Sequence, residues 1–337
     1  RQMCIRDRDK DRHQLFVEPE GLDTTEMYVQ GMSTSMPIDV QYAFLRTIPG
    51  FEDVKMMRPA YAIEYDLLDP LQLYPTLEVI KLPGLYSAGQ SNGTSGYEEA
   101  AAQGLVAGIN AALKIQGKDP FILARHEAYI GSLVDDLVTK GADEPYRMMT
   151  SRSEYRLILR QDNADLRLTE KGHSIGLVGE ERYARFLERK KKHEEAMDYI
   201  RTQRFTPKEE INRALESMGT APLTTGTGAD QILKRPEMTY RKMMEMLGCP
   251  AFDEEAVEEM EITVKYEGYM ARQEAAVRKA ARMENEKLPP DMDYLSLDGI
   301  STEARQKMDK IRPLSLGQAA RIPGVSPADI SVLMVYV

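Results

Sequence analysis

The sequence is poor in the residues that mark several common classes of protein. Tryptophan is absent, and the only cysteines are Cys4 and Cys249, too few for a disulfide framework and unable to form a zinc site by themselves. No run of about eighteen apolar residues occurs, so no transmembrane helix is expected. The start of the chain, Arg1 to Arg8, lacks the apolar stretch of a signal peptide. These absences favour a cytoplasmic protein with reduced thiols and no membrane span.

Basic residues are outnumbered by acidic ones. The 337 residues include 44 Lys and Arg against 54 Asp and Glu, which gives a net charge of −10. This balance argues against a protein that coats nucleic acid by bulk charge, although a local cluster of Lys and Arg can still bind phosphates. Because 42% of the residues are hydrophobic, the chain can form two or three domain cores, and wholesale disorder is excluded.

Two kinds of pattern follow each other along the chain. Short β-prone runs between glycine, proline and aspartate turn signals predict strands at 15–17, 26–29, 62–65, 76–80 and 85–88. Helices are predicted at 37–46 and 97–113. After 117–120 the pattern is helical, apart from a β-like piece at 155–160. We therefore expect an α/β part followed by an all-α part, and we interpret the charged, unpatterned start at 1–8 as non-native sequence.

The most informative segment is 84–104, in which a short apolar strand, a glycine-rich loop and a helix follow one another. The loop glycines let the backbone approach a ligand, and the first N–H groups of the helix favour an anionic or carbonyl-bearing group. Gly104 and Gly108 would let the helix pack closely on a sheet. The spacing is not GxGxxG, and no Lys-Ser or Lys-Thr follows as in a P-loop. From the motif alone, a cofactor site and a plain strand-to-helix turn both remain open.

The string from Ala88-Gly89-Gln90 to Ala102-Gln103-Gly104 resembles the MnmG (GidA) family of tRNA-modifying flavoproteins. It is similar to the second flavin-contacting segment of two-dinucleotide-fold flavoproteins. Collinear strings similar to the same family occur at 13–21, 31–37, 58–66, 144–148, 150–157, 162–169, 235–237 and 265–269. The resemblance implies a partial two-dinucleotide-type FAD-binding fold followed by a helical C-terminal region.

The resemblance also implies a domain organisation and an activity. Residues 1–40 are expected to be a remnant of the nested NADH/substrate insertion, and residues 41–118 the C-terminal part of the FAD-binding domain. A mainly helical domain with a basic cluster is expected at 119–215, and a C-terminal helical domain for partner and tRNA docking at 216–337. Family members use FAD, NADH and a folate one-carbon donor. With the GTPase partner MnmE, and usually as homodimers, they build a carboxymethylaminomethyl group on C5 of wobble uridine 34 in tRNA.

Two features of the family are not found in this sequence. A GxGxxG flavin-binding half is expected upstream of residue 1, and a reactive cysteine is expected in a Gly-Pro-Arg-Tyr-Cys-Pro-Ser segment. Cys4 lies in unlike surroundings, so no catalytic residue is assigned, and we expect the chain alone to retain little or no FAD. Two alternatives stay open. One is a non-catalytic helical module that binds tRNA or a partner, and the other is an ordinary two-dinucleotide-fold reductase.

By resemblance, the candidates for flavin contact are Gln90, Asn92, Gly93 and Gly96. A second candidate site is a basic cluster formed by Arg147, Arg152, Arg156, Arg160 and Arg167. An extended segment would place Arg156 and Arg160 on one face, where guanidinium forks suit phosphates. The competing interpretation is a structural network with Glu154, Asp162 and Asp165. With the resemblance, we expect Arg147, Arg156 and Arg160 to face flavin or tRNA.

Three further expectations concern the helical part. Lys190 to His193 lie on a helix predicted at 180–201 and are interpreted as a solvated face. Ile262, Tyr266, Tyr269 and Met270 recur at helical spacing and are interpreted as core. Residues 315–330 predict helix, turn and helix, with Ser326 as an N-cap, and in the family this end docks the GTPase partner.

Overall fold

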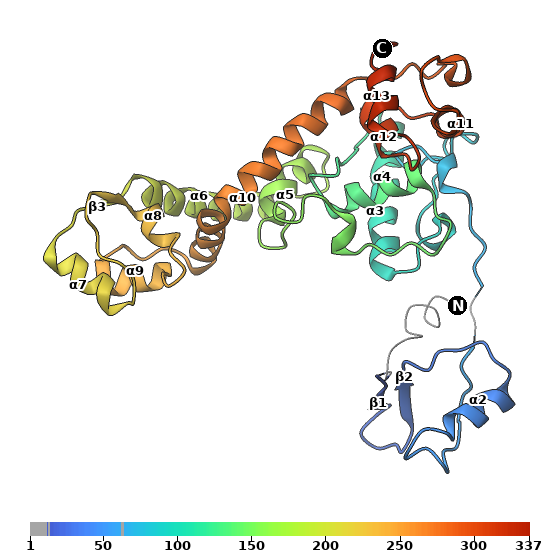
Figure 1. Ribbon diagram of the computed structural model, residues 1–337, viewed down its shortest axis with the longest axis horizontal. Coiled ribbons are helices and arrows are strands. Elements are labelled where there is room, and N and C mark those ends of the chain that lie inside the picture. Colours follow the sequence, from blue (N-terminus) through green and yellow to red (C-terminus); the bar gives the residue numbers. More distant parts are fainter. Residues whose placement is uncertain (1–11, 13, 62–63) are drawn as a thin grey trace. The chain divides into compact units, whose positions relative to one another are not determined.

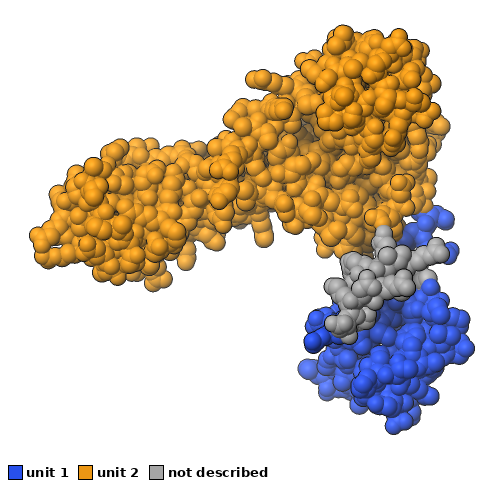
Figure 2. Space-filling model, in the orientation of Figure 1, with its two compact units in different colours: residues 1–66 blue, residues 67–337 orange. Residues whose placement is uncertain are grey.

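The computed structural model describes residues 12, 14–61 and 64–337, and it divides the chain into two compact units, 1–66 and 67–337 (Figure 2). The first boundary therefore falls within the expected domain 41–118. The start at 1–8, interpreted as non-native, lies outside the described residues together with Cys4. The strand predicted at 62–65 lies partly outside them, and its described part is not a strand.

Unit 1 contains a hairpin and a short helix. Strand β1 (Phe16–Pro19) pairs antiparallel with β2 (Met27–Gln30), and helix α2 (Ile38–Leu45) follows, so these predicted elements are confirmed. Among the described residues of this unit only Gln41 is buried. Its side chain both donates to and accepts from the backbone of Ala60, each at 2.9 Å. Two side-chain hydrogen bonds, rather than an apolar core, therefore join α2 to the segment that follows it.

Unit 2 begins with short turns and two helices packed together. They are η1 (Pro70–Gln72), η2 (Gly89–Asn92), α3 (Tyr97–Ile115) and α4 (Tyr129–Lys140). The apolar core between them is formed by Leu73, Leu77, Val79, Val106, Ala107, Val134 and Val138. The strands predicted at 76–80 and 85–88 are wrong. These runs form only isolated bridges, because Leu77 has φ +65° and closes a turn onto Tyr74.

Helix α3 confirms the predicted helix but not its expected packing. Its buried face carries Gln103, Val106, Ala107, Asn110 and Leu113. Gly104 and Gly108 lie on the opposite, exposed face, where no described atom lies within 4 Å of an added Cβ. The sheet expected against these two glycines is not found among the described residues.

The β-like piece predicted at 155–160 is also wrong. After η3 (Thr150–Arg152) the chain forms consecutive turns, in which the carbonyl of Tyr155 accepts hydrogen bonds from the N–H groups of Ile158 and Leu159. Tyr155 and Leu159 are both buried, and the turn brings their two side chains onto the same, inward side of the segment. Burial of these two side chains overrides the β propensity of the run.

The middle of unit 2 is a helical module with its own core. Its elements are α5 (Ala164–Ser174), α6 (Glu180–Thr202), β3 (Arg204–Phe205), α7 (Glu209–Ser217), β4 (Thr227–Gly228), α8 (Ala229–Leu233) and α9 (Tyr240–Leu247). The helix predicted at 180–201 is confirmed. A single apolar cluster runs from Ala196 to Val264 and includes Cys249, so it crosses the expected boundary at 215/216.

A long helix, α10 (Glu254–Asn285), leads from this module to a C-terminal bundle (Figure 1). The bundle consists of η4 (Tyr294–Ser296), α11 (Thr302–Ile311), α12 (Leu316–Arg321) and α13 (Pro327–Leu333). Ser326 caps α13 with Pro327 at its first position, as predicted. Arg321 of α12 contacts Asp135 of α4 and Glu284 of α10, which ties the bundle to both helices.

The expected α/β plus all-α organisation is confirmed, with few strands and a helical C-terminal region. Among the described residues, no helix has the length and apolar character needed to cross a membrane.

Candidate functional site

The loop between Ser87 and α3 is organised by buried polar side chains. Asn92 is fully buried, and its amide donates to the carbonyl of Ser87 at 2.9 Å and to Oε1 of Gln103 at 2.8 Å. The hydroxyl of Ser87 donates to Oδ1 of Asn92 at 2.6 Å. Gln103 in turn donates to Thr94, whose hydroxyl donates to the carbonyl of Gly89. Because each partner is satisfied inside the protein, the network fixes the loop conformation.

The four predicted flavin contacts occupy different positions in this loop. Gln90 is exposed, whereas the side chain of Asn92 is engaged inside the loop. Gly93 has φ +82°, and an added Cβ would lie 2.7 Å from Cβ of Ala142. A Cβ at Gly96 would overlap the Glu99 carboxylate. The structure brings these residues together, and their contact with flavin stays a prediction.

The start of α3 has no side-chain N-cap of its own and is covered by Glu99. Oε1 of this buried carboxylate accepts from the N–H of Met148 at 2.7 Å, while Oε2 has no hydrogen-bond partner among the described residues. Nε of Arg147 lies 3.7 Å from Oε1. Tyr146 also pairs with the loop through Gly93 and Ser95. The exposed guanidinium of Arg147 therefore lies beside the glycine-rich loop.

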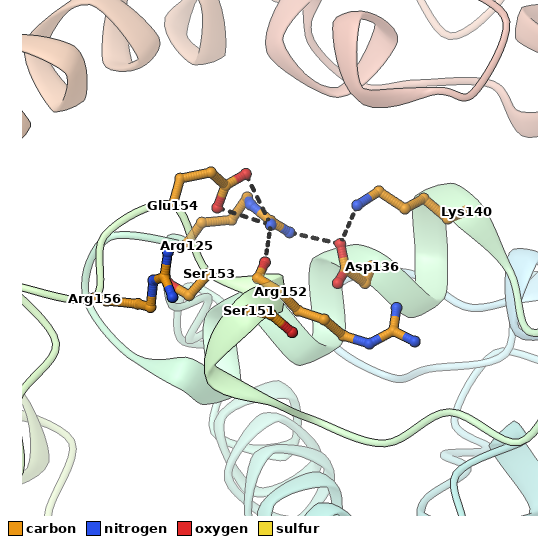
Figure 3. A pocket seen from close by; sticks show the side chains of 8 residues that line it. All are labelled: Arg125, Asp136, Lys140, Ser151, Arg152, Ser153, Glu154 and Arg156. Carbon is orange, nitrogen blue, oxygen red and sulfur yellow. Dashed lines mark hydrogen bonds and ion pairs between the residues drawn. The ribbon is translucent and has the colours of Figure 1, made fainter. Parts of the chain in front are cut away.

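A polar cavity of about 440 Å³ lies next to this corner (Figure 3). It is lined by Arg125, Asp136, Lys140, Ser151, Arg152, Ser153, Glu154 and Arg156. Arg125 is buried at its centre and contacts Asp135, Asp136 and Glu154 at 2.8–3.0 Å. It also donates to the carbonyl of Arg152. Arg125 therefore holds the loop that carries Arg152 and Arg156.

Electrostatic shifts mark the same cluster. Burial favours the neutral form of Asp136, but the hydrogen bond from Lys140 and the charge of Arg125 outweigh it and lower the pKa of Asp136. Burial, together with the nearby carboxylate, raises the pKa of Tyr146, whose hydroxyl donates to Asp136 at 2.8 Å. Asp136 thus stays ionised and Tyr146 stays neutral, so the charge of this cavity wall does not change around neutral pH.

The predicted basic cluster divides into two groups. Arg156 is exposed at the cavity and has no ion-pair partner among the described residues. Arg160 instead contacts Asp162 at 3.0 Å, and Arg167 donates to backbone carbonyls and to Asn163. Arg152 lies over the ring of Tyr146, 4.4 Å from its centre.

The competing interpretation, in which the arginines pair with nearby carboxylates in a structural network, therefore holds for Arg160. Because the segment is a turn, Arg156 and Arg160 do not form the alternating face that an extended strand would give. The expected contact of Arg160 with flavin or tRNA stays a prediction without that support.

The lysines of the run on α6 form a solvated, paired helix face, as interpreted from the sequence. The interpretation is wrong for His193, whose side chain is 15% exposed and lies against the buried Glu259. Lys190 contacts Glu170, Lys191 contacts Glu195, and Lys192 contacts both Glu188 and Asp253. These ion pairs neutralise the run locally.

Comparisons with known proteins identify the family. The family model for glucose inhibited division protein A matches residues 2–119. Models for the MnmG/GidA C-terminal helical domain and helical bundle, both described as parts of a tRNA modifying enzyme, match residues 180–274 and 276–337. The chain belongs to the MnmG (GidA) family.

Curated MnmG relatives cover nearly all of this chain. A tRNA uridine 5-carboxymethylaminomethyl modification enzyme from Clostridium kluyveri is 56% identical over 98% of the chain, and one from Enterococcus faecalis is 55% identical over 99%. The crystal structure of Aquifex aeolicus GidA (form II) superimposes with a TM-score of 0.84 at 45% identity over 99% of the chain. The chain spans about half of each of these proteins, 53% in every case.

The sequence did not reveal two residues that organise the glycine-rich loop and the cavity. Gln103 could have been found, because Glu99, Gln103 and Asn110 are polar side chains at helical spacing on the same face as Val106. Arg125 lies in an irregular segment and carried no such signal. No group of three or more metal-ligating side chains occurs among the described residues.

Proposed function

We propose that this chain forms part of an FAD-dependent tRNA-modifying enzyme and contributes one side of the flavin site and an RNA-binding surface. The observation that carries the proposal is the pairing of the glycine-rich loop with the segment that carries Arg147, within a chain that matches MnmG over nearly its whole length. By family, the modified group is the carboxymethylaminomethyl substituent of wobble uridine 34.

The corner formed by η2 and the start of α3 has features that suit a flavin nucleotide. Gln90 presents an exposed amide, and Glu99 Oε2 is a buried acceptor without a partner among the described residues. An acceptor at this position suits ribityl hydroxyl groups, which can donate hydrogen bonds, better than a pyrophosphate. When bound, the flavin supplies the redox chemistry, and these residues bind and orient it.

The exposed arginines suit the RNA backbone. Arg147 is 59% exposed at its side chain, and Arg156 lies free at the cavity rim. Guanidinium groups bind phosphate oxygens through two parallel hydrogen bonds, and each phosphate contact releases counterions. Because the whole chain has a net charge of −10, RNA affinity must come from such local groups.

The remaining family properties are part of the same proposal. They comprise NADH and a folate one-carbon donor as co-substrates, the GTPase partner MnmE and a homodimer. A second candidate function is a non-catalytic helical module that binds tRNA or a partner. It is favoured by the two apolar cores at 196–264 and 288–333, which contain no residue of the flavin corner.

The arginine assignment predicts the effect of two substitutions. We expect Arg147→Gln and Arg156→Gln each to weaken binding of a tRNA transcript, and each to reduce the slope of log affinity against log salt by about one. Fluorescence anisotropy at several salt concentrations measures both quantities. Arg185→Gln is the matched control, because the one ion pair of this exposed arginine within the described part of the chain joins it to Glu181 on its own helix. Unchanged affinity and slope in both test variants would contradict the proposal.

A further inference from the structure

The middle of α10 exposes aromatic side chains that the sequence had assigned to a core. Tyr266 and Tyr269 are 46% and 57% exposed, and Ile262 and Met270 are only partly buried, so the core interpretation is wrong for the two tyrosines. The tyrosine rings contact each other with centroids 6.4 Å apart. Cζ of Arg272 lies 5.5 Å from the centre of the Tyr269 ring. Tyr266, Tyr269 and Arg272 thus form a continuous ladder along one face of the helix.

The charge of this ladder is not neutralised by its neighbours. Of the carboxylates on the same stretch, Glu267 contacts Lys234 and Glu274 contacts Arg278. Arg272 has no ion-pair partner among the described residues, and neither have Lys279 and Arg282, which follow on the same helix. The ladder therefore combines exposed aromatic rings with unpaired cations. This combination suits the bases and phosphates of a nucleic acid, whereas a surface that binds an apolar protein face would not require the cations.

Two contacts join the helix to the loop that carries Arg156. The side-chain amide of Gln273 donates to the carbonyl of Glu154 at 3.1 Å, and Arg160 donates to Sδ of Met270 at 3.3 Å. The residues flanking the ladder are therefore fixed against the segment that bears the proposed phosphate contact. The two surfaces are therefore joined by direct contacts within unit 2.

We infer that the ladder of Tyr266, Tyr269 and Arg272 is a stacking platform for unpaired bases of the bound RNA. The inference rests on the proposed function, since it assigns a second contact surface for the same RNA. Tyrosine faces stack on any base, and an arginine above one ring adds a cationic contact to the adjoining phosphate. Arg156 would hold the backbone near the cavity while the ladder holds bases that have left the helix stack.

The test compares an RNA hairpin with a single-stranded loop and a fully paired duplex as fluorescent probes for the purified chain. For the Tyr266→Leu/Tyr269→Leu double variant we expect roughly tenfold weaker hairpin binding with an unchanged salt slope. Binding of the duplex, whose bases stay stacked, should not change. The matched control, Tyr266→Phe/Tyr269→Phe, keeps both rings and should bind the hairpin like the unaltered chain. Arg272→Gln should reduce the salt slope by about one.

The outcomes separate this inference from the proposed function. If the leucine variant binds the hairpin as tightly as the phenylalanine variant, the platform is overturned even when the Arg147 and Arg156 substitutions weaken binding. Equal weakening of hairpin and duplex binding would also overturn it. If the unaltered chain binds neither probe, the proposed function fails and the platform fails with it. Because both tyrosines are exposed, equal thermal unfolding midpoints are expected and show that the variants are folded.

Discussion

Arg125 is a buried guanidinium that faces the carboxylates of Asp135, Asp136 and Glu154. Burial works against its charge, yet the surrounding carboxylates raise the pKa of Arg125 above its ordinary value, so the guanidinium stays protonated. Removing one partner of such a cluster leaves like charges unpaired in a poorly hydrated place. The stability of the loop at 151–156 therefore depends on this side chain.

The Arg125→Met variant tests that dependence. We expect it to lower the free energy of unfolding by about 3–5 kcal/mol, because the methionine fills the space but removes the cation shared by Asp135 and Asp136, which leaves Arg321 and Lys140 as their remaining cationic partners. Urea titration followed by circular dichroism measures the change. Glu154→Gln is the control, and since that carboxylate is half exposed we expect a loss below about 1 kcal/mol. Equal stability of the methionine variant and the unaltered chain would show that the carboxylates find other partners.

At single positions, the sequence predicted the glycine-rich loop but not which of its polar side chains point inward. The glycine-rich loop was predicted from its spacing, and Gly93 does adopt a left-handed conformation. Asn92 was expected to face a ligand, yet the structure shows its amide bonded to Ser87 and Gln103. Which polar group points inward depends on the partner presented by a helix residue eleven positions away, and local spacing does not contain that information.

Helices α6 and α10 enclose a carboxyl group in an unusual ionisation state. Glu259 of α10 is 4% exposed, and burial raises its pKa from 4.5 to about 7, despite Arg189 at 3.6 Å. Nδ1 of His193 lies 3.8 Å from it, and burial together with the charge of Arg189 lowers the pKa of that imidazole. Asp162 and Asp165 also face the group and disfavour its ionisation. The Glu259 carboxyl is thus mainly protonated at pH 6.

Because the folded state binds the Glu259 proton more tightly than the unfolded state, this carboxyl stabilises the fold below pH 4.5, and the contribution is lost as the pH rises through about 7. We expect Glu259→Gln, which cannot ionise, to be more stable than the unaltered chain by about 1–3 kcal/mol at pH 8, and equally stable near pH 4.5. Urea unfolding at both pH values measures the difference. Glu255→Gln, at an exposed partner of Arg189, should show no such pH dependence. A variant that is less stable at pH 8 would mean that the Arg189 ion pair outweighs burial.

Helices and the hairpin of β1 and β2, whose hydrogen bonds join residues close in sequence, were predicted well, and the strands predicted in unit 2 were not. Helices α2, α3 and α6 lie where the sequence pattern predicted them. The runs at 76–80 and 155–160 have strand-like composition, but a strand needs a partner, and here the backbone groups bond within turns instead. The exposed tyrosines of α10 failed for a related reason, since helical spacing identifies a face without showing what covers it.

At the scale of the whole chain, several surfaces are open that a compact fold would normally cover. Unit 1 buries only Gln41 among its described residues, and α3 leaves Tyr97 and Ile115 about nine-tenths exposed on the face that carries its exposed glycines. The chain spans 53% of the length of its relatives. In our proposal, the part of those proteins that this chain lacks packs against these open surfaces. The flavin site would then be shared between the two parts.

A flavin measurement distinguishes this proposal from the non-catalytic module. We expect the purified chain to be colourless, and a fusion to the remaining part of the Clostridium kluyveri relative to retain FAD absorbance. In the fusion, Gly93→Val should lower retention, because its side chain would displace Ala142, whereas Gly179→Ala meets no neighbouring atom and serves as the control. A colourless fusion that still binds tRNA would favour the module, while a yellow chain without the fusion would show that half of the site suffices.

Asp135 accepts from Arg125 through one oxygen and from Arg321 of the C-terminal bundle through the other. One carboxylate is therefore a joint between the bundle and the loop of Arg156, which is held by the same Arg125. If the bundle moved away from α4, either the contact between Arg321 and Asp135 would break or Asp135 would move with the bundle and disturb its contact with Arg125. A displacement of the bundle is therefore passed to the loop of Arg156 through the charge-assisted hydrogen bonds of this one side chain.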